Sequence, residues 1–253
     1  QAVRSNGERG AQTGSVEAIE DVNGFIDLKR TVKQLELGPP RFLIPEGPFN
    51  TKTHALAIRA FAEAVLDAGL DGASEWRPAS DLLLRRPPRG GNVVREAGDT
   101  DLQAALRVLD AREGCLAVQG PPGSGKTYLG ARIAIARAAH GPVAVTALSH
   151  RAISNFLDEV CAAREGAAVR VGQRVGNDAR CKADDLVVFA DNGPVITALD
   201  EETVQVVGGT SWLFSREDLE RRFDTIIVDE AGQMSLADVI AVSRCCLLYT
   251  SDA

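Results

Sequence analysis

The chain has 253 residues, of which 45% are hydrophobic and 25% charged, and its 28 Lys and Arg against 35 Asp and Glu give a net charge of −7. This length fits one large domain or two small ones, which bury a core without disulfides or metals. No apolar run approaches the roughly 18–20 residues that span a bilayer, and the composition excludes collagen, coiled coil and wholesale disorder. The acidic balance argues against a basic coat for nucleic acid but leaves room for a local binding track.

The cysteines are scattered. The five cysteines form no C-x-x-C pair, and the chain has only three histidines. The pattern therefore indicates neither a zinc site nor a disulfide framework. It is typical of a reducing compartment, and we expect a cytoplasmic protein with no membrane association. Cys115 and Cys161 are expected to be small buried apolar residues.

The two ends differ from the rest in composition. Residues 1–15 are polar and Gly-rich, which predicts a loose tail or linker. Residues 246–253 resemble the translated end of a transposon from a sequencing library, although their Leu-Leu-Tyr-Thr is also good strand composition. We therefore expect a chain that begins upstream of Gln1 and stops before its fold is complete.

Residues 16–49 are predicted to form a small β unit, such as an incomplete barrel. Strand-like runs at Val16–Ile19, Phe25–Leu28 and Val32–Leu37 are separated by turn signals, and an Asn-Gly pair suited to a tight hairpin precedes the second run.

Residues 50–99 are predicted to form a helical stalk followed by an Arg/Pro-rich linker. Asn50 or Thr51 caps an amphipathic helix that ends at Gly69. Residues 77–95 are rich in arginine, which suits contacts to phosphates, but a solvated charged linker is the simpler interpretation.

From residue 100 the pattern alternates between strand and helix. This predicts an α/β fold over residues 100–245, with a parallel sheet flanked by helices. Strands are expected at residues 115–119, 143–147, 169–171, 204–208 and 225–228, and helices at residues 101–109, 126–139, 149–163 and 235–244.

A phosphate-binding pattern, G-x-x-x-x-G-K-[ST], lies between a predicted strand and a predicted helix. Its glycines let successive backbone N–H groups point at phosphate oxygens, and the helix N-terminus adds positive charge. Lys126 is expected to reach the β- and γ-phosphates of ATP, and the Thr127 hydroxyl to coordinate Mg²⁺. A coincidental Gly-rich turn is the alternative, which the flanking elements disfavour. The residues are Gly120, Pro121, Pro122, Gly123, Ser124, Gly125, Lys126 and Thr127.

An acidic pair follows an apolar strand later in the chain. Asp229 and Glu230 come directly after Phe223–Val228. At a strand tip beside the phosphate loop, Asp229 would hold Mg²⁺ and Glu230 would polarise the attacking water. An ordinary helix cap is the alternative. The sequence therefore predicts that Lys126 and Asp229 converge on one magnesium-bound triphosphate.

These residues together resemble the first RecA-like lobe of a superfamily 1 helicase of the 1B type. The resemblance is to the nonsense-mediated-decay helicase group and to bacterial fusions of a RecB-like nuclease with a helicase. Its discriminating feature is Asp229-Glu230-Ala-Gly-Gln233, in place of the D-E-A-D of the sister superfamily. The resemblance implies that Gln233 contacts the γ-phosphate or its water, so that Lys126, Glu230 and Gln233 would be the catalytic residues.

The resemblance also implies contacts to single-stranded DNA or RNA. Residues 146–155 resemble motif Ia, which grips the strand backbone through Ser149, His150 and Asn155. Taken alone, Ser149 is an ordinary helix cap, and His150 and Asn155 are ordinary surface residues.

Two further residues have roles implied only by the resemblance. Thr210, in Gly208–Ser211, stands in the next nucleic-acid motif, although it is also an ordinary turn residue. Gln103 stands where the family places an adenine-reading glutamine, but its surroundings match poorly. Because aromatic residues are few, backbone contacts are expected rather than base stacking, with Trp212 and Phe214 in the core.

The resemblance implies an ATP-dependent helicase or translocase that moves 5′→3′ and has a second RecA-like lobe in the same chain, with room for a fused nuclease module. That second lobe would supply an arginine finger worth about 10³–10⁵ in rate, so residues 1–253 alone are expected to bind Mg-ATP weakly and to turn over negligibly. Two alternatives stay open: an AAA+ ring ATPase, which shares the Gly-Pro-Pro-Gly-x-Gly-Lys-Thr loop, and an ATP switch that binds nucleic acid or a partner without hydrolysis.

Overall fold

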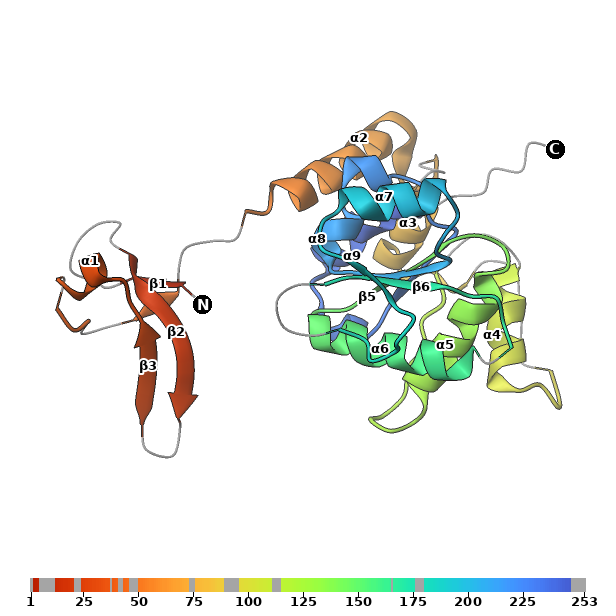
Figure 1. The fold of residues 1–253 in the computed structure, drawn as a ribbon. Coiled ribbons are helices and arrows are strands. Elements are labelled where there is room, and N and C mark those ends of the chain that lie inside the picture. Colours follow the sequence, from red (N-terminus) through yellow and green to blue (C-terminus); the bar gives the residue numbers. More distant parts are fainter. Residues whose placement is uncertain are drawn as a thin grey trace. The chain divides into compact units, whose positions relative to one another are not determined.

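A computed structural model describes residues 2–4, 12–20, 24–36, 38–40, 43–45, 50–72, 76–88, 96–110, 115–164, 166–175 and 180–246. The chain divides into two compact units, Gln1–Thr51 and Lys52–Ala253, each of which is described by itself (Figure 1). The interpretation of residues 246–253 as foreign sequence falls, beyond Cys246, outside the described residues. Within the described ranges, no helix has both the length and the apolar content needed to cross a bilayer.

The first unit is a four-stranded antiparallel sheet in the order β3-β2-β1-β4. Residues 1–15, predicted as a loose tail, supply β1 and the start of β2. Strand pairing uses backbone groups, so a polar segment can join a sheet without a buried apolar face. The strands are β1 Ala2–Arg4, β2 Gln12–Glu20, β3 Phe25–Lys29 and β4 Ile44–Pro45.

The strand predicted at Val32–Leu37 is wrong, because Val32–Leu35 forms the short helix α1. A capping box starts this helix: the Thr31 N–H donates to Gln34 Oε1 at 2.8 Å, and Thr31 Oγ1 accepts from the Gln34 N–H at 3.4 Å. The Thr-x-x-Gln pattern was the overlooked signal, and its local hydrogen bonds outweigh the β propensity of the residues inside it.

The second unit contains a five-stranded parallel sheet in the order β7-β6-β8-β5-β9. The predicted α/β class with a parallel, helix-flanked sheet is confirmed. The strand at Thr225–Val228 has the predicted bounds, whereas β7 was not predicted. The strands are β5 Val143–Thr146, β6 Val171–Arg174, β7 Val187–Phe189, β8 Val206–Gly208 and β9 Thr225–Val228.

Helices cover both faces of this sheet (Figure 1). Val143 and Val145 share a buried core with α5 and α6, whereas Ala144 shares another with α7, α8 and α9. Because successive strand residues face opposite sides, a strand covered on both faces is a continuous apolar run. The helices are α4 Asp101–Asp110, α5 Lys126–Arg137, α6 His150–Ala163, α7 Gly193–Asp200, α8 Ser211–Phe214 and α9 Leu236–Val242, with 3₁₀ helices η2 Glu217–Leu219, η3 Ala231–Gln233 and η4 Ser243–Cys245.

The predicted stalk packs onto the same unit rather than standing apart. It consists of α2 (Lys52–Gly72) and α3 (Arg77–Leu83), and α3 occupies the start of the predicted linker. Phe61, Trp76 and Ile240 of α9 share a buried cluster, in which the Phe61 and Trp76 ring centroids lie 5.6 Å apart. Burial of apolar side chains against α9 therefore holds both helices to the lobe.

The sequence correctly predicts where α2 breaks, because Gly69 has the non-helical angles φ 76° and ψ 167°. The strand predicted at Cys115–Gln119 is wrong: residues 115–125 are irregular backbone. A strand requires a neighbouring backbone to complete its hydrogen bonds, and in the part of the chain that the structure describes no strand pairs with residues 115–119.

A close approach between β8 and α6 requires glycine at position 208. A Cβ atom there would lie 2.6 Å from Leu157 Cδ1 and 2.9 Å from Ile153 Cγ2. Both neighbours are fully buried, so neither can move aside without disturbing the core.

We expect Gly208→Ala to lower the free energy of unfolding by about 1–3 kcal/mol, the usual effect of overpacking a core. The measurement is urea denaturation followed by circular dichroism. Gly193→Ala is the matched control, since a Cβ at Gly193 meets nothing within 4 Å. Equal urea midpoints for the two variants would contradict the close packing of β8 against α6.

Candidate functional site

The loop that leads into α5 adopts backbone conformations that favour glycine. Gly123 has φ 77°, and Gly125, the N-cap of α5, has φ 84°. At Gly120 the constraint is space, because a Cβ there would lie 2.4 Å from Ser124 Oγ. The three glycines of the predicted phosphate loop are therefore required by the curl of the loop itself.

Lys126 bends back over this loop. Its Nζ donates to the carbonyl oxygens of Gly120 at 2.7 Å and Pro121 at 2.9 Å. The loop thus holds the ammonium group close to its own backbone. Charge-assisted bonds to phosphate oxygens are stronger than those to neutral carbonyls, so a bound phosphate can take the place of these acceptors.

Asp229 lies at the tip of β9, where its N–H donates to the Thr146 carbonyl of β5 at 2.8 Å. Burial raises the pKa of the Asp229 carboxyl above its usual range, and the carboxylate of Glu230 also raises it. The backbone N–H of Glu230 and the charge of Lys126 lower the pKa. Lys126 therefore lies near enough to act electrostatically on Asp229, as the predicted convergence requires.

Glu230 and Gln233 lie on one tight turn after Asp229. Glu230 has φ 51°, a left-handed conformation that costs a non-glycine residue about 1–2 kcal/mol. The Gln233 N–H donates to the Glu230 carbonyl at 2.8 Å, which closes the turn η3. Both side chains are exposed, so a strained backbone presents two polar groups to solvent beside the strand tip.

These residues fit Mg-ATP. The desolvated Asp229 carboxylate is of the kind that a divalent cation stabilises, and Thr127 supplies a hydroxyl in the first turn of α5. The helix N-terminus and the Lys126 ammonium supply positive charge for phosphates. When bound, Mg²⁺ would offset the negative charge of the phosphates.

The carboxyl ends of three strands meet at one edge of the sheet. The Gly209 N–H donates to the Val145 carbonyl at 3.0 Å, and the Asp229 N–H donates to the Thr146 carbonyl beside it. The segments that follow β5, β8 and β9 therefore begin side by side. This is the edge at which open α/β sheets bind ligands.

The residues predicted to contact nucleic acid lie in the segments after β5 and β8. Ser149 caps α6, since its Oγ accepts from the Ala152 N–H at 3.1 Å. His150 begins the helix and is half-buried, Asn155 is exposed on its second turn, and Thr210 precedes α8. The Ser149 hydroxyl thus serves the helix cap, whereas Asn155 is open to solvent.

Gln103, the predicted adenine-reading residue, has a local role in the structure. Its Oε1 accepts from the Thr100 N–H at 2.9 Å and from the Thr100 hydroxyl at 3.0 Å, and its own N–H donates to Thr100 Oγ1. This capping box starts α4. The Gln103 side chain would have to leave the box to reach a base.

The sequence did not indicate the surroundings of Thr146 and Trp212. Among the residues that the structure describes, the buried Thr146 hydroxyl has no hydrogen-bond partner, and it lies next to the carbonyl that holds Asp229. Trp212, predicted to lie in the core, is 44% exposed and meets the His54 ring edge-on at 4.5 Å between centroids. Phe214 is buried as predicted. The only sequence signal for the buried Thr146 hydroxyl was a threonine at the end of an apolar strand.

We expect Asp229→Asn to stabilise the nucleotide-free protein by roughly 1–3 °C in Tm. Burial raises the pKa of this carboxyl, so its stabilising effect is present below its ordinary pKa and is lost as the pH rises through the folded-state value. At pH 7.5 the charged group is therefore unfavourable, and asparagine removes it.

The same substitution should abolish most of the rise in Tm that Mg-ATP produces, because the metal loses a carboxylate ligand. Thermal melts with and without Mg-ATP measure both effects. Asp191→Asn, at an exposed position, is the control and should change neither. A lower nucleotide-free Tm for Asp229→Asn would show that the Asp229 charge does not destabilise the folded protein.

A family model described as an AAA domain matches residues 97–246, which is more than half of the chain. The match includes the phosphate loop, the tip of β9 and the sheet edge between them. A search of the curated proteins found no match.

Proposed function

Because the chain belongs to the AAA domain family and carries a P-loop NTPase domain on a parallel α/β sheet, we propose that it is the ATP-binding lobe of a nucleic-acid helicase or translocase. ATP hydrolysis would drive movement along single-stranded DNA or RNA. The likeness to superfamily 1B helicases supports 5′→3′ movement and a second RecA-like lobe that supplies an arginine finger.

One observation carries the proposal. The backbone hydrogen bonds from Asp229 to Thr146 and from Gly209 to Val145 join the candidate nucleotide site to both segments predicted to contact a nucleic-acid strand. A change at the tip of β9 on ATP binding or hydrolysis thus reaches those segments through adjacent backbone. Coupling of the two sites would make the affinity for a nucleic-acid strand depend on the bound nucleotide.

The residues have distinct roles in this proposal. Lys126 binds the β- and γ-phosphates, and Thr127 and Asp229 hold Mg²⁺. Glu230 accepts a proton from the attacking water, and its fixed turn keeps the carboxylate in position. Gln233, on the same turn, orients that water or the γ-phosphate.

A ring-forming AAA+ ATPase is the second candidate, favoured by the description of the matching family model. Such an enzyme would assemble into hexamers on ATP, and its assembly would not require a nucleic-acid strand. The resemblance of the segments after β5 and β8 to nucleic-acid motifs favours the helicase.

The coupling predicts that the affinity of residues 1–253 for a fluorescent single-stranded oligonucleotide changes about 5–150-fold between Mg-ADP and a non-hydrolysable Mg-ATP analogue. Fluorescence anisotropy measures it. Lys126→Ala should abolish the change in affinity but retain nucleotide-free binding of the oligonucleotide, whereas Lys182→Ala, at an exposed position, should behave as wild type.

Asn155→Ala should weaken binding of the oligonucleotide without altering nucleotide affinity. ATP-dependent hexamers with no strand affinity would favour the ring ATPase.

We expect Glu230→Gln to lower the residual ATP hydrolysis of residues 1–253, followed under single-turnover conditions because it is very slow without the second lobe, by about 10²-fold or more, since the general base is lost. Mg-ATP affinity should stay within about twofold, since Glu230 holds neither metal nor phosphate in this proposal. Glu202→Gln is the matched control, being an exposed glutamate with a similar φ of 53°. Equal hydrolysis by the two variants, measured as phosphate release, would contradict the assignment of Glu230.

A further inference from the structure

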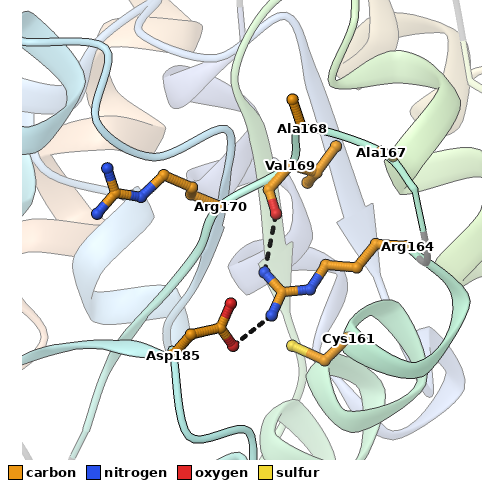
Figure 2. A pocket seen from close by; sticks show the side chains of 7 residues that line it. All are labelled: Cys161, Arg164, Ala167, Ala168, Val169, Arg170 and Asp185. Carbon is orange, nitrogen blue, oxygen red and sulfur yellow. Dashed lines mark hydrogen bonds and ion pairs between the residues drawn. The ribbon is translucent and has the colours of Figure 1, made fainter.

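Two thiols that are 20 residues apart in the sequence lie side by side in the structure. Cys161, in the last turn of α6, and Cys181, in the segment after β6, have their Sγ atoms 3.8 Å apart. Cys181 is 1% exposed, whereas Cys161, predicted to be buried, is half-buried. Cys161 lines an open depression on the surface (Figure 2). One thiol of the pair is therefore accessible and the other is covered.

Hydrogen bonds hold both segments in place. The Cys181 N–H donates to Gln173 Oε1 at 2.8 Å, and Gln173 Nε2 donates to Ser154 Oγ of α6 at 3.0 Å. The Lys182 N–H donates to Asp158 Oδ1 of α6 at 2.7 Å. These bonds keep the two thiols side by side, and a disulfide requires their Sγ separation to shorten from 3.8 Å to roughly 2.05 Å.

The surroundings make the two thiols unequal. Figure 2 shows the Arg164 guanidinium between the Val169 carbonyl, to which it donates at 2.8 Å, and the Asp185 carboxylate, with which it forms an ion pair. The hydrogen bond with Cys181 and the Arg164 charge lower the pKa of the Cys161 thiol, against the opposing effects of burial and of the Asp185 and Asp158 carboxylates. The same hydrogen bond and burial raise the pKa of Cys181.

We propose that Cys161 and Cys181 form a peroxide-responsive thiol pair, in which Cys161 is the reacting thiol and Cys181 the resolving thiol. An accessible thiol next to a covered partner thiol is the arrangement that favours reversible oxidation. The proposal does not depend on the binding of ATP or nucleic acid.

The chemistry takes two steps. The Cys161 thiolate attacks one oxygen of hydrogen peroxide, an S–O bond forms, the O–O bond breaks, and hydroxide leaves to give a sulfenic acid. The Cys181 sulfur then attacks the Cys161 sulfur, the S–S bond forms, the S–O bond breaks, and water leaves with the Cys181 proton. Two thiols lose two electrons and the peroxide gains two.

The test is titration of the reduced full chain with hydrogen peroxide, followed by alkylation and peptide mass mapping. We expect a Cys161–Cys181 cross-linked peptide that dithiothreitol removes. Tm should rise by roughly 5–10 °C on oxidation, because the bond closes a loop in the unfolded chain. Cys181→Ser should trap Cys161 as a sulfenic acid that dimedone labels, whereas Cys115→Ser, at another half-buried thiol, should leave the cross-link intact.

A second measurement needs no variant. In the unmodified chain, Cys161 should react with iodoacetamide at a lower pH than Cys115, whose thiol pKa is raised by burial. The proposal is overturned if Cys161 and Cys115 alkylate with the same pH profile, if peroxide carries Cys161 to the sulfinic acid without a disulfide, or if the cross-link joins other cysteines.

Discussion

The register of three parallel strands fixes the position of the candidate site. β5 pairs with β8 on one side and β9 on the other, so that Val145 lies opposite Gly208 and Thr146 opposite Val228. A slip of one residue would turn each side chain to the opposite face. The same slip would break the bond from Asp229 to Thr146 and move the carboxylate along the edge. The apolar packing that fixes this register therefore fixes the nucleotide site as well.

That packing also supports conformations that are unfavourable by themselves. Glu230 has a left-handed backbone, and Asp229 carries a charge that burial disfavours. Such features persist only where the surrounding structure holds them. Their concentration at one strand tip is what a site prepared for a cation and a phosphate requires, because the ligand then relieves the cost of the buried charge.

The sequence predicted best what depends on short-range chemistry. The phosphate loop requires glycine at fixed spacings, and Ser149 caps α6 through a hydrogen bond from a residue three positions further along the chain. The sequence failed where a neighbour distant in the chain decides the outcome, as at Cys115–Gln119, whose strand composition has no pairing partner in the described ranges. The contact of Cys161 with Cys181 belongs to the second class, because the path of β6 brings the two together and no local motif marks it.

The helix α6 connects the proposed nucleic-acid site with the proposed thiol pair. Its first turn follows β5 at the sheet edge proposed to bind a nucleic-acid strand, and its last turn carries Cys161. A helix of 14 residues is about 21 Å long, so α6 reaches from that edge of the sheet to Cys161. If strand binding shifts α6 relative to β6, a disulfide at the far end resists that shift and weakens binding. By thermodynamic linkage the bound strand must then make the disulfide easier to reduce by the same factor, so the two sites would regulate each other without direct contact.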